Sequence, residues 1–460
     1  YKVVNVAPSQ AHVELVKPTI DINTASNYLL MQMDKEMDKQ KVEKQAITAA
    51  IKEDQEKDLF GRLQDVNAQV RIKAFGELAS TMAYGCARSA KLLAAGLGDP
   101  DAGVRYAALA ATKEVVVPGD ETVVAAMLEQ LEGSEPSLRC AALEALAVVA
   151  RKGDQDVVPK VCECLEDPIV DVHNAAFRTV CVVAAKGSQD VLSALSNCLA
   201  DARTDVRSAA VAAFVELAPK GDAYAAMVAS QHLEHSKADV RCAALAALSR
   251  VAQPGAKQAV EAVAARLGDG SERVREEAAE ALGRVAAKGD AEAVAAVTKF
   301  LDHQSADVRR AAVAALPKVA EQGDEKAFAA AQALSKNQNA GIRQTALEAL
   351  VSVSRKGSDA AVQAVAVFLE DDADEVREAA VQALSKVAAK GSKNAIAAAA
   401  ARLRYKFSDV RLSAVQALAG VADRGNTEAI DALIPCLKES NVDVKKAVVG
   451  ALKALGHDAA

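Results

Sequence analysis

An arginine recurs at a fixed interval of 34 residues along most of this chain. The series is Arg71, Arg105, Arg139, Arg207, Arg241, Arg275, Arg309, Arg343, Arg377 and Arg411, with His173 and Lys445 in the two remaining places. Twelve copies therefore follow one another without an insertion or a deletion. A constant period of roughly 20–50 residues predicts a repeat array rather than a set of globular domains.

Apolar residues recur at fixed distances from this arginine, which we number position zero. Positions −1, 3, 4, 7 and 10 are mainly apolar, with alanine at position 3 in eleven copies. These offsets lie on one face of an α-helix. Eleven glycines, from Gly85 to Gly425, occupy position 14, directly after the apolar run. A left-handed helix cap is expected at such a glycine, so the pattern predicts one helix per repeat that ends there.

A second helix is predicted between each glycine and the next arginine. Helix N-cap residues follow the glycine in nine units, at Asp120, Asp154, Ser188, Asp222, Asp290, Asp324, Ser358, Ser392 and Asn426. An apolar pattern about three turns long begins three residues later, as at Ala293, Val294, Val297 and Leu301. Each repeat is therefore predicted to be two antiparallel helices. The fold class is all-α, an α-solenoid of about twelve two-helix repeats.

Composition agrees with this architecture and excludes some functions. The chain is 51% hydrophobic but only 3% aromatic and has no tryptophan, as suits closely stacked helices. Its net charge is −7, whereas a general nucleic-acid binder is usually basic, so no nucleic-acid partner is expected. No uncharged apolar run reaches the roughly 18 residues that a membrane helix needs, so no membrane insertion is expected.

Two segments precede the repeats. Residues 1–22 mix β-branched and polar residues with Pro8 and Pro18, which predicts an extended arm. Such an arm lies against the array, binds another chain or is disordered. Residues 23–52 predict a charged helix in which Tyr28, Leu29, Leu30, Met33 and Met37 form an apolar stripe. We expect this stripe to pack against the first repeat. The solenoid is assigned to residues 53–460.

The eight cysteines follow the repeat register rather than a disulfide pattern. Cys140 and Cys242 share one repeat position, and another position is shared by Cys164, Cys198 and Cys436. Cysteines placed in this way are expected to be small buried residues in a reducing compartment, with the cytoplasm preferred. An organelle interior stays open, because the chain begins at Tyr1 and a removed targeting peptide would not be seen.

The pattern Leu-x-Asp-x-x-x-x-Val-Arg-x-x-Ala-x-x-Ala-Leu resembles the HEAT repeat, most closely the variety of phycobilisome-lyase-type proteins. Residues Leu369 to Leu384 match it in full, and Leu199 to Phe214 match it with phenylalanine in the last place. The resemblance extends over about residues 53–460. It implies an α-solenoid that serves as part of a larger assembly, and it does not identify a partner.

The same resemblance implies a ladder between stacked repeats, formed by the arginine and an aspartate six residues before it. Its members would be Asp65, Arg71, Asp99, Arg105, Asp201, Arg207, Asp269, Arg275, Asp371 and Arg377, with a further aspartate at Asp167. The aspartate is replaced in six repeats, where the ladder should be interrupted. These replacements are Gly133, His235, His303, Asn337, Tyr405 and Glu439.

No residue set in the sequence predicts catalysis. Deoxyhypusine hydroxylase is a HEAT-like enzyme that holds iron through His-Glu dipeptides, and none of the six histidines here is followed by glutamate. His232 and His235 are one turn apart but lack a third ligand in register. Cys162 and Cys164 form a Cys-x-Cys pair without a second pair, as zinc sites usually require. We therefore predict no catalytic residues, no metal, no cofactor and no small-molecule substrate.

A row of cations stands directly before the glycines, at Lys152, Lys186, Lys220, Lys288, Lys356, Lys390 and Arg424. These residues would line one edge of the array, where they either oppose the helix macrodipole or receive an acidic partner. We predict a non-enzymatic protein–protein interaction scaffold or structural subunit, with proteins of a larger complex as partners. Binding would use the arm and the outward positions one, two, five, eight and nine of the second helices. The alternative is an accessory or lyase-like subunit acting on a chromophore-bearing protein.

Overall fold

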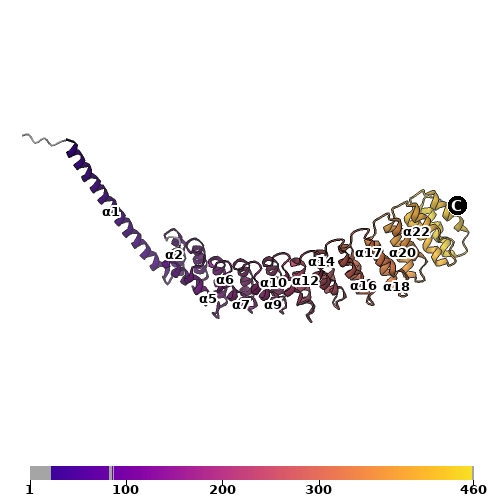
Figure 1. The fold of residues 1–460 in the computed structure, drawn as a ribbon, viewed down its shortest axis with the longest axis horizontal. Helices are drawn as coiled ribbons and strands as arrows, with labels where there is room; N and C mark the ends of the chain where they lie inside the picture. The colour runs from indigo at the N-terminus through magenta and orange to yellow at the C-terminus, as the bar shows by residue number, and fades with distance from the viewer. Residues whose placement is uncertain (1–21, 82–84, 86, 458–460) are drawn as a thin grey trace, which may run out of the picture. The chain divides into compact units, whose positions relative to one another are not determined.

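The computed structural model describes residues 22–81, 85 and 87–457, and every regular element within them is helical. Figure 1 shows the helices following one another in chain order. The predicted arm at residues 1–22 lies outside the described residues except for Ile22, which begins the first helix. None of the described helices combines the length and the apolar content needed to span a bilayer.

Each repeat contributes a first helix with an odd number and a second helix with an even number. The first helices are α1 (Ile22–Leu63), α3 (Ala87–Leu97), α5 (Glu121–Leu131), α7 (Val157–Glu163), α9 (Gln189–Cys198), α11 (Ala223–Ser230), α13 (Lys257–Ala265), α15 (Ala291–Thr298), α17 (Glu325–Ala333), α19 (Asp359–Ala366), α21 (Lys393–Ala400) and α23 (Thr427–Leu433). Short 3₁₀ segments extend five of them: η1 (Cys164–Glu166), η2 (Arg266–Gly268), η3 (Leu334–Lys336), η4 (Val367–Glu370) and η5 (Ile434–Lys438).

The second helices carry the repeat arginine. They are α2 (Ala68–Thr81), α4 (Ala102–Val115), α6 (Pro136–Val149), α8 (Val170–Val183), α10 (Thr204–Leu217), α12 (Ala238–Val251), α14 (Glu272–Val285), α16 (Ala306–Val319), α18 (Ala340–Val353), α20 (Asp374–Val387), α22 (Ser408–Val421) and α24 (Val442–Ala454). The chain is thus an all-α solenoid, as predicted from the 34-residue period.

The chain divides into two compact units, one ending at Val117 and the other beginning at Pro118. In the first unit α1 packs on α2, and α4 packs on both α2 and α3. In the second unit each second helix packs against the next one along the chain, while most first helices pack against their neighbours in a parallel layer. Nothing in the regular spacing of the arginines indicates the division at Val117.

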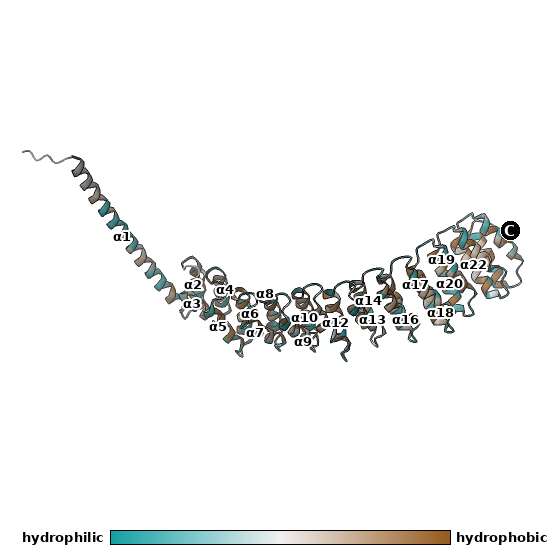
Figure 2. Ribbon diagram, viewed as in Figure 1, coloured by the Kyte–Doolittle hydropathy of each residue, from teal (hydrophilic) through white to brown (hydrophobic). Residues whose placement is uncertain are grey.

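The core is formed by apolar side chains from both the first and the second helices. Figure 2 shows hydrophobic stretches, in brown, along the helices of the repeats. Alanine at position 3 is fully buried wherever it occurs, as at Ala142 and Ala312, and so is Leu146 at position 7. Alanine lets neighbouring second helices approach closely, while each buried leucine contributes about 1.5–3 kcal/mol through removal of apolar surface from water. The apolar positions predicted from the sequence therefore form this core.

The glycine at position 14 does not end its own helix, contrary to the prediction. The second helix already ends at position 10, as at Val149, and the residue after it is extended. Gly153 has a φ of 78° and occupies the third place of a β-turn closed by the bond from Asp154 N–H to the Arg151 carbonyl (3.1 Å). A type II turn requires positive φ at that place, which only glycine adopts without strain.

The same glycine joins neighbouring repeats through its backbone. Gly153 N–H donates to the carbonyl of Val183, the last residue of the next second helix. The ten equivalent glycines make the same bond, at 2.6–2.9 Å. A helix leaves its last carbonyls unpaired, so the turn of one repeat caps the second helix of the repeat after it.

The N-cap residues lie where the sequence places them. Asp120, Asp222, Asp290, Asp324, Ser358, Ser392 and Asn426 each accept a hydrogen bond from a backbone N–H in the first turn of the following helix. Asp154 accepts from Asp156 and Val157, although the helix itself begins at Val157. Ser188 precedes α9 without a side-chain bond.

The methionine stripe of α1 does not pack against the first repeat. Met33 is 60% exposed and Met37 is 65% exposed. Among the side chains of α1 that the structure describes, only Leu59 and Leu63 at its C-terminal end are buried, and those of Tyr28, Leu29 and Leu30 lie outside the description. The prediction was wrong because helical spacing shows that apolar residues share a face, but does not show what lies beside that face.

Candidate interaction surface

The repeat arginine first holds the link between the two helices of its own repeat. In Arg343 the Nη1 atom donates to the backbone carbonyls of Asn337 (2.8 Å) and Gln338 (3.0 Å). All ten arginines donate in this way to the carbonyl six residues earlier, at 2.6–2.9 Å. The guanidinium thus satisfies carbonyls that would otherwise be left unpaired in a partly buried link.

Five of these arginines also bind a carboxylate in the next repeat, 28 residues further on. The pairs are Arg71–Asp99, Arg139–Asp167, Arg241–Asp269, Arg343–Asp371 and Arg411–Glu439, each with two hydrogen bonds of 2.6–3.2 Å. Burial alone would raise the pKa of Asp371, but the hydrogen bonds from Arg343 and from the Ala373 N–H, together with the charge of Arg343, lower that pKa on balance. Glu439 is therefore a member of the ladder, and the predicted interruption there was wrong.

Three arginines pair with a carboxylate at a second position, because the next repeat lacks the usual acid. Where that repeat has His235, His303 or Tyr405 instead, the arginine lies near the aspartate 32 residues further on. Arg207 lies 3.4 Å from Asp239, Arg275 lies 3.9 Å from Asp307, and Arg377 lies 4.0 Å from Asp409. These contacts are longer than the five ladder pairs, and Arg377 Nη2 also bonds Asp374 of its own helix. At these three places the predicted interruption is therefore a substitution of one carboxylate position for another.

The remaining ladder positions make no carboxylate pair with the next repeat. Arg309, for which the next repeat has Asn337 in place of the acid, donates to the hydroxyl of Thr345 in that repeat (3.0 Å). Arg105 holds the carbonyls of Asp99 and Pro100. Asp65 accepts from the backbone N–H of Asn67, and His235 and His303 accept through Nδ1 from the residue two places on. The position six before the arginine therefore also fixes the turn into the second helix.

Arg203 compensates for the histidine in the fourth repeat. His173 is fully buried, and its Nε2 lies 3.3 Å from Asp205 without hydrogen-bond geometry. Arg203 comes from the next repeat and donates to the Asp167 carbonyl (2.7 Å) and to the Asp201 carboxylate (3.1 Å). These are the carbonyl and the carboxylate that an arginine at position 173 would bind, and the Arg203 hydrogen bonds lower the pKa of Asp201.

Replacing Arg203 with alanine should lower the free energy of local unfolding of α8–α10 by about 2 kcal/mol, because the bonds of a charged donor to the Asp167 carbonyl and the Asp201 carboxylate are lost. Adding His173→Arg to that variant should recover most of the loss by restoring the regular arginine. Hydrogen exchange of peptides from α8 to α10 measures both effects. Arg178→Ala, at an exposed position of α8, should change the free energy by less than about 0.5 kcal/mol. A double variant no more stable than Arg203→Ala would contradict this account.

The predicted basic row lies on the turns of the second unit. All seven cations are exposed, and each is the second residue of a β-turn whose third residue is the left-handed glycine. Lys186 lies 3.5 Å from Glu216, and Lys390 Nζ donates to the carbonyl of Gly420. The other five side chains form no ion pair or hydrogen bond with any residue that the structure describes: Lys152, Lys220, Lys288, Lys356 and Arg424.

Two acidic residues at the opposite ends of second helices each pair with two arginines. Asp239 pairs with Arg207 and Arg273, and Asp307 pairs with Arg275 and Arg310. In contrast, the last carbonyl of each helix that precedes a row cation is already bonded by a glycine N–H. Capping a carbonyl therefore does not require these cations, and the macrodipole alone is a weak reason for them.

Histidine and cysteine side chains show no catalytic arrangement among the described residues. His232 Nε2 lies 3.1 Å from the hydroxyl of Ser196, which is buried and donates to the Val228 carbonyl. Burial and the nearby His235 lower the pKa of His232. No group of His, Cys, Asp and Glu side chains within residues 22–81, 85 and 87–457 is placed to hold a metal ion.

A groove between α7 and α9 is lined by both apolar and acidic side chains, among them Cys162 and Cys198. Burial raises the pKa of Cys162 to about 11 and that of Cys198 to about 12. Both are therefore protonated thiols at neutral pH and poor nucleophiles. The seven cysteines within the described residues are all free.

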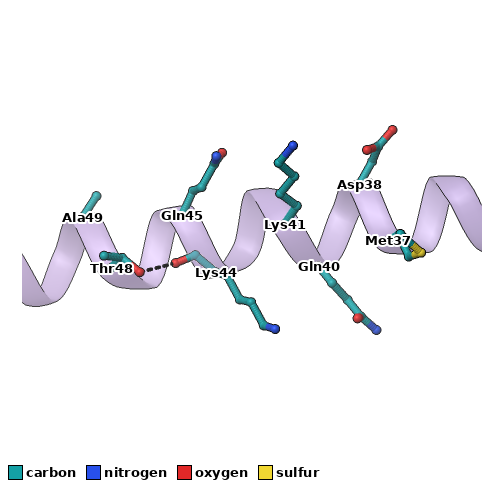
Figure 3. A pocket seen from close by; sticks show the side chains of 8 residues that line it. All are labelled: Met37, Asp38, Gln40, Lys41, Lys44, Gln45, Thr48 and Ala49. Carbon is teal, nitrogen blue, oxygen red and sulfur yellow. Dashed lines mark hydrogen bonds between the residues drawn. The ribbon is translucent and has the colours of Figure 1, made fainter.

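Helix α1 carries a shallow hollow of its own, shown in Figure 3. Its eight lining residues, from Met37 to Ala49, belong to this one helix, and their side chains point to different sides of it. The hydroxyl of Thr48 donates to the Lys44 carbonyl (2.7 Å), as on any exposed helix. No second element of the described part of the chain lines the hollow, so there it is an exposed helix surface rather than a binding pocket.

Comparison with known proteins identifies the repeats. A family model described as HEAT repeats matches residues 124–215, 226–317, 294–385 and 327–419. A comparison with curated protein sequences found no match. Among solved structures, the chain is similar to the karyopherin Kap121p, bound to the extreme C-terminus of the protein phosphatase Cdc14p. The TM-score is 0.48, with 15% identity over 85% of this chain and 48% of the karyopherin.

A structure of Kap95p with RanGDP gives a TM-score of 0.39, with 13% identity over 86% of this chain and 60% of that one. The chain spans about half the length of Kap121p. The family match is to HEAT repeats in general, and the closer resemblance to the phycobilisome-lyase-type variety stays a prediction.

Proposed function

The chain belongs to the HEAT-repeat proteins, and from this premise we propose that it is a non-enzymatic scaffold whose basic row receives an acidic segment of a partner protein. The row is the seven turn cations from Lys152 to Arg424. Partners of this kind would make the chain a subunit of a larger complex in a reducing compartment. Residues 1–22 would add a tether by binding an extended segment of another chain.

The observation that carries this proposal is the contrast between the two ends of the second helices. At the N-terminal ends Asp239 and Asp307 each pair with arginines of the chain itself, whereas five of the seven cations at the other end have no partner among the described residues. Exposed cations held at one place in successive turns attract an anionic partner and raise its association rate. No contact among the described residues favours the accessory or lyase-like alternative.

Binding of a fluorescent 25-residue polyglutamate peptide tests the proposal. Reversing the charge of Lys152, Lys220, Lys288 and Lys356 to glutamate should weaken binding at least about tenfold, since each lost cation contributes about 0.2–1 kcal/mol and gains a repulsion. The matched control reverses four other exposed lysines of the second unit, Lys237, Lys299, Lys326 and Lys438, and changes the net charge equally. Equal weakening by both variants would show that only net charge matters, and the proposal would fail.

A further inference from the structure

The spacing of the basic row restricts the shape of the segment that it can hold. Each row cation lies on a turn whose glycine N–H is bonded at 2.6–2.9 Å to the end of the next second helix. The turns are therefore fixed to helices that pack side by side, and neighbouring helices lie about 8–10 Å apart. A partner that uses several row cations must present carboxylates at this interval.

We infer that the partner segment is an extended polyproline II-like chain with an acidic residue at every third position. This inference rests on the proposed function of the row. A polyproline II chain has three residues per turn and a rise of about 3.1 Å, so its residues i and i+3 share one side and lie about 9 Å apart. In a β-strand, residues i and i+3 point to opposite faces, and residues i and i+2 are only about 7 Å apart.

An α-helical partner would need an acidic residue about every seven positions and roughly 50 residues of straight helix to follow the whole row. An extended chain needs only about 25 residues and can bend at each residue to follow the turns. Nucleic acid fits less well, because the N-cap carboxylates of Asp154, Asp222 and Asp290 lie two residues beyond row cations and would repel closely spaced phosphates.

The row has two gaps, at Pro254 and Gln322, which occupy the same place in their turns. Gln322 is exposed, and only its backbone carbonyl is used, by Arg355 (2.9 Å). A lysine at this position would therefore fill one gap in the row without disturbing the turn. Gln338 offers a matched control, because it is also exposed, uses only its carbonyl and lies at the other end of α18.

The experiment compares two 25-residue peptides with the same nine Glu, eight Pro and eight Ala residues. One repeats Glu-Pro-Ala, and the other collects its glutamates in one block. We expect the spaced peptide to bind the full chain at least about fivefold more tightly. Gln322→Lys should tighten binding of the spaced peptide about two- to fivefold, as one more exposed ion pair allows, while Gln338→Lys should leave it nearly unchanged.

Equal binding of the two peptides would overturn the inference about spacing but leave the acidic partner in place. Failure of both peptides and of polyglutamate to bind would overturn the proposed function as well. A 25-nucleotide single-stranded DNA that binds as tightly as the spaced peptide, and gains equally from Gln322→Lys, would also overturn the inference.

Discussion

Replacing Arg343 with methionine is expected to lower the free energy of local unfolding around α18 and α20 by about 3–5 kcal/mol, because it leaves a buried carboxylate without its cation. The side chains of Arg343 and Asp371 are 9% and 6% exposed, and the pair is joined by hydrogen bonds of 2.6 and 2.7 Å. The substitution also frees the carbonyls of Asn337 and Gln338. Hydrogen exchange of peptides from residues 340–387 measures the loss locally, since a repeat array need not unfold in one step.

Arg310→Met is the matched control, because Arg310 is 70% exposed and pairs only with the exposed Asp307. Exposed ion pairs contribute little to stability, so the free energy of local unfolding of this variant should fall by less than about 1 kcal/mol. Losses of similar size in the two variants would contradict the role given to the buried pair.

The effect of Arg343→Met should depend on pH in a defined direction. The pKa of Asp371 is lowered in the folded protein. Its contribution to stability is therefore fully present above the unfolded pKa, about 3.9, and is lost as the pH falls through the lower folded pKa. The difference in the free energy of local unfolding between the native chain and the variant should accordingly narrow below about pH 4. A difference that stays constant down to pH 3 would show that packing, not charge, explains the loss.

Replacing Gly96 with alanine should destabilise α2–α4 by about 2–3 kcal/mol. Gly96 is buried in α3, and a Cβ atom there would lie 2.1 Å from Cζ of Phe75, whose ring is 2% exposed. Either the ring or the helix must shift, and such overpacking costs about 1–3 kcal/mol or more, which exceeds the gain of up to about 1 kcal/mol in helix propensity. Hydrogen exchange of peptides from residues 68–115 measures the change.

Two further variants separate overpacking from other causes. Gly76→Ala, at an exposed position of α2 with nothing within 4 Å of the added atom, should stabilise by about 0.5–1 kcal/mol. Phe75→Leu removes the ring atoms that would collide, so Gly96→Ala should be neutral or stabilising in that background. If Gly96→Ala were equally harmful with leucine at position 75, the collision would not be its cause.

The periodic features of the fold could be predicted from the sequence, because they repeat with the same physical cause in each copy. Alanine at position 3 and leucine at position 7 mark the buried face, and Asp222 or Ser392 after a glycine marks a helix start. The turn glycine was recognised as left-handed but assigned to the wrong helix. The bond from Gly153 to Val183 joins residues 30 positions apart, and a pattern local to one repeat does not show it.

The partners of the repeat arginine were harder to predict, because each depends on which carboxylate the next repeat supplies. A signal was present in the sequence. Where His235, His303 and Tyr405 replace the usual acid, Asp239, Asp307 and Asp409 stand four residues later. That aspartate also occurs in repeats with the usual acid, as at Asp171, so its use becomes clear only from the geometry. Arg203 had no such signal, since its role depends on His173 in another repeat.

Zero-length cross-linking of the native complex tests most directly whether the basic row is the binding surface. A carbodiimide joins lysine amines to carboxylates that they touch. We predict that cross-links to partner carboxylates concentrate on Lys152, Lys186, Lys220, Lys288, Lys356 and Lys390, and are scarce at the equally exposed Lys237, Lys299, Lys326 and Lys438. Cross-links spread evenly over both sets, or found only outside the row, would contradict the account.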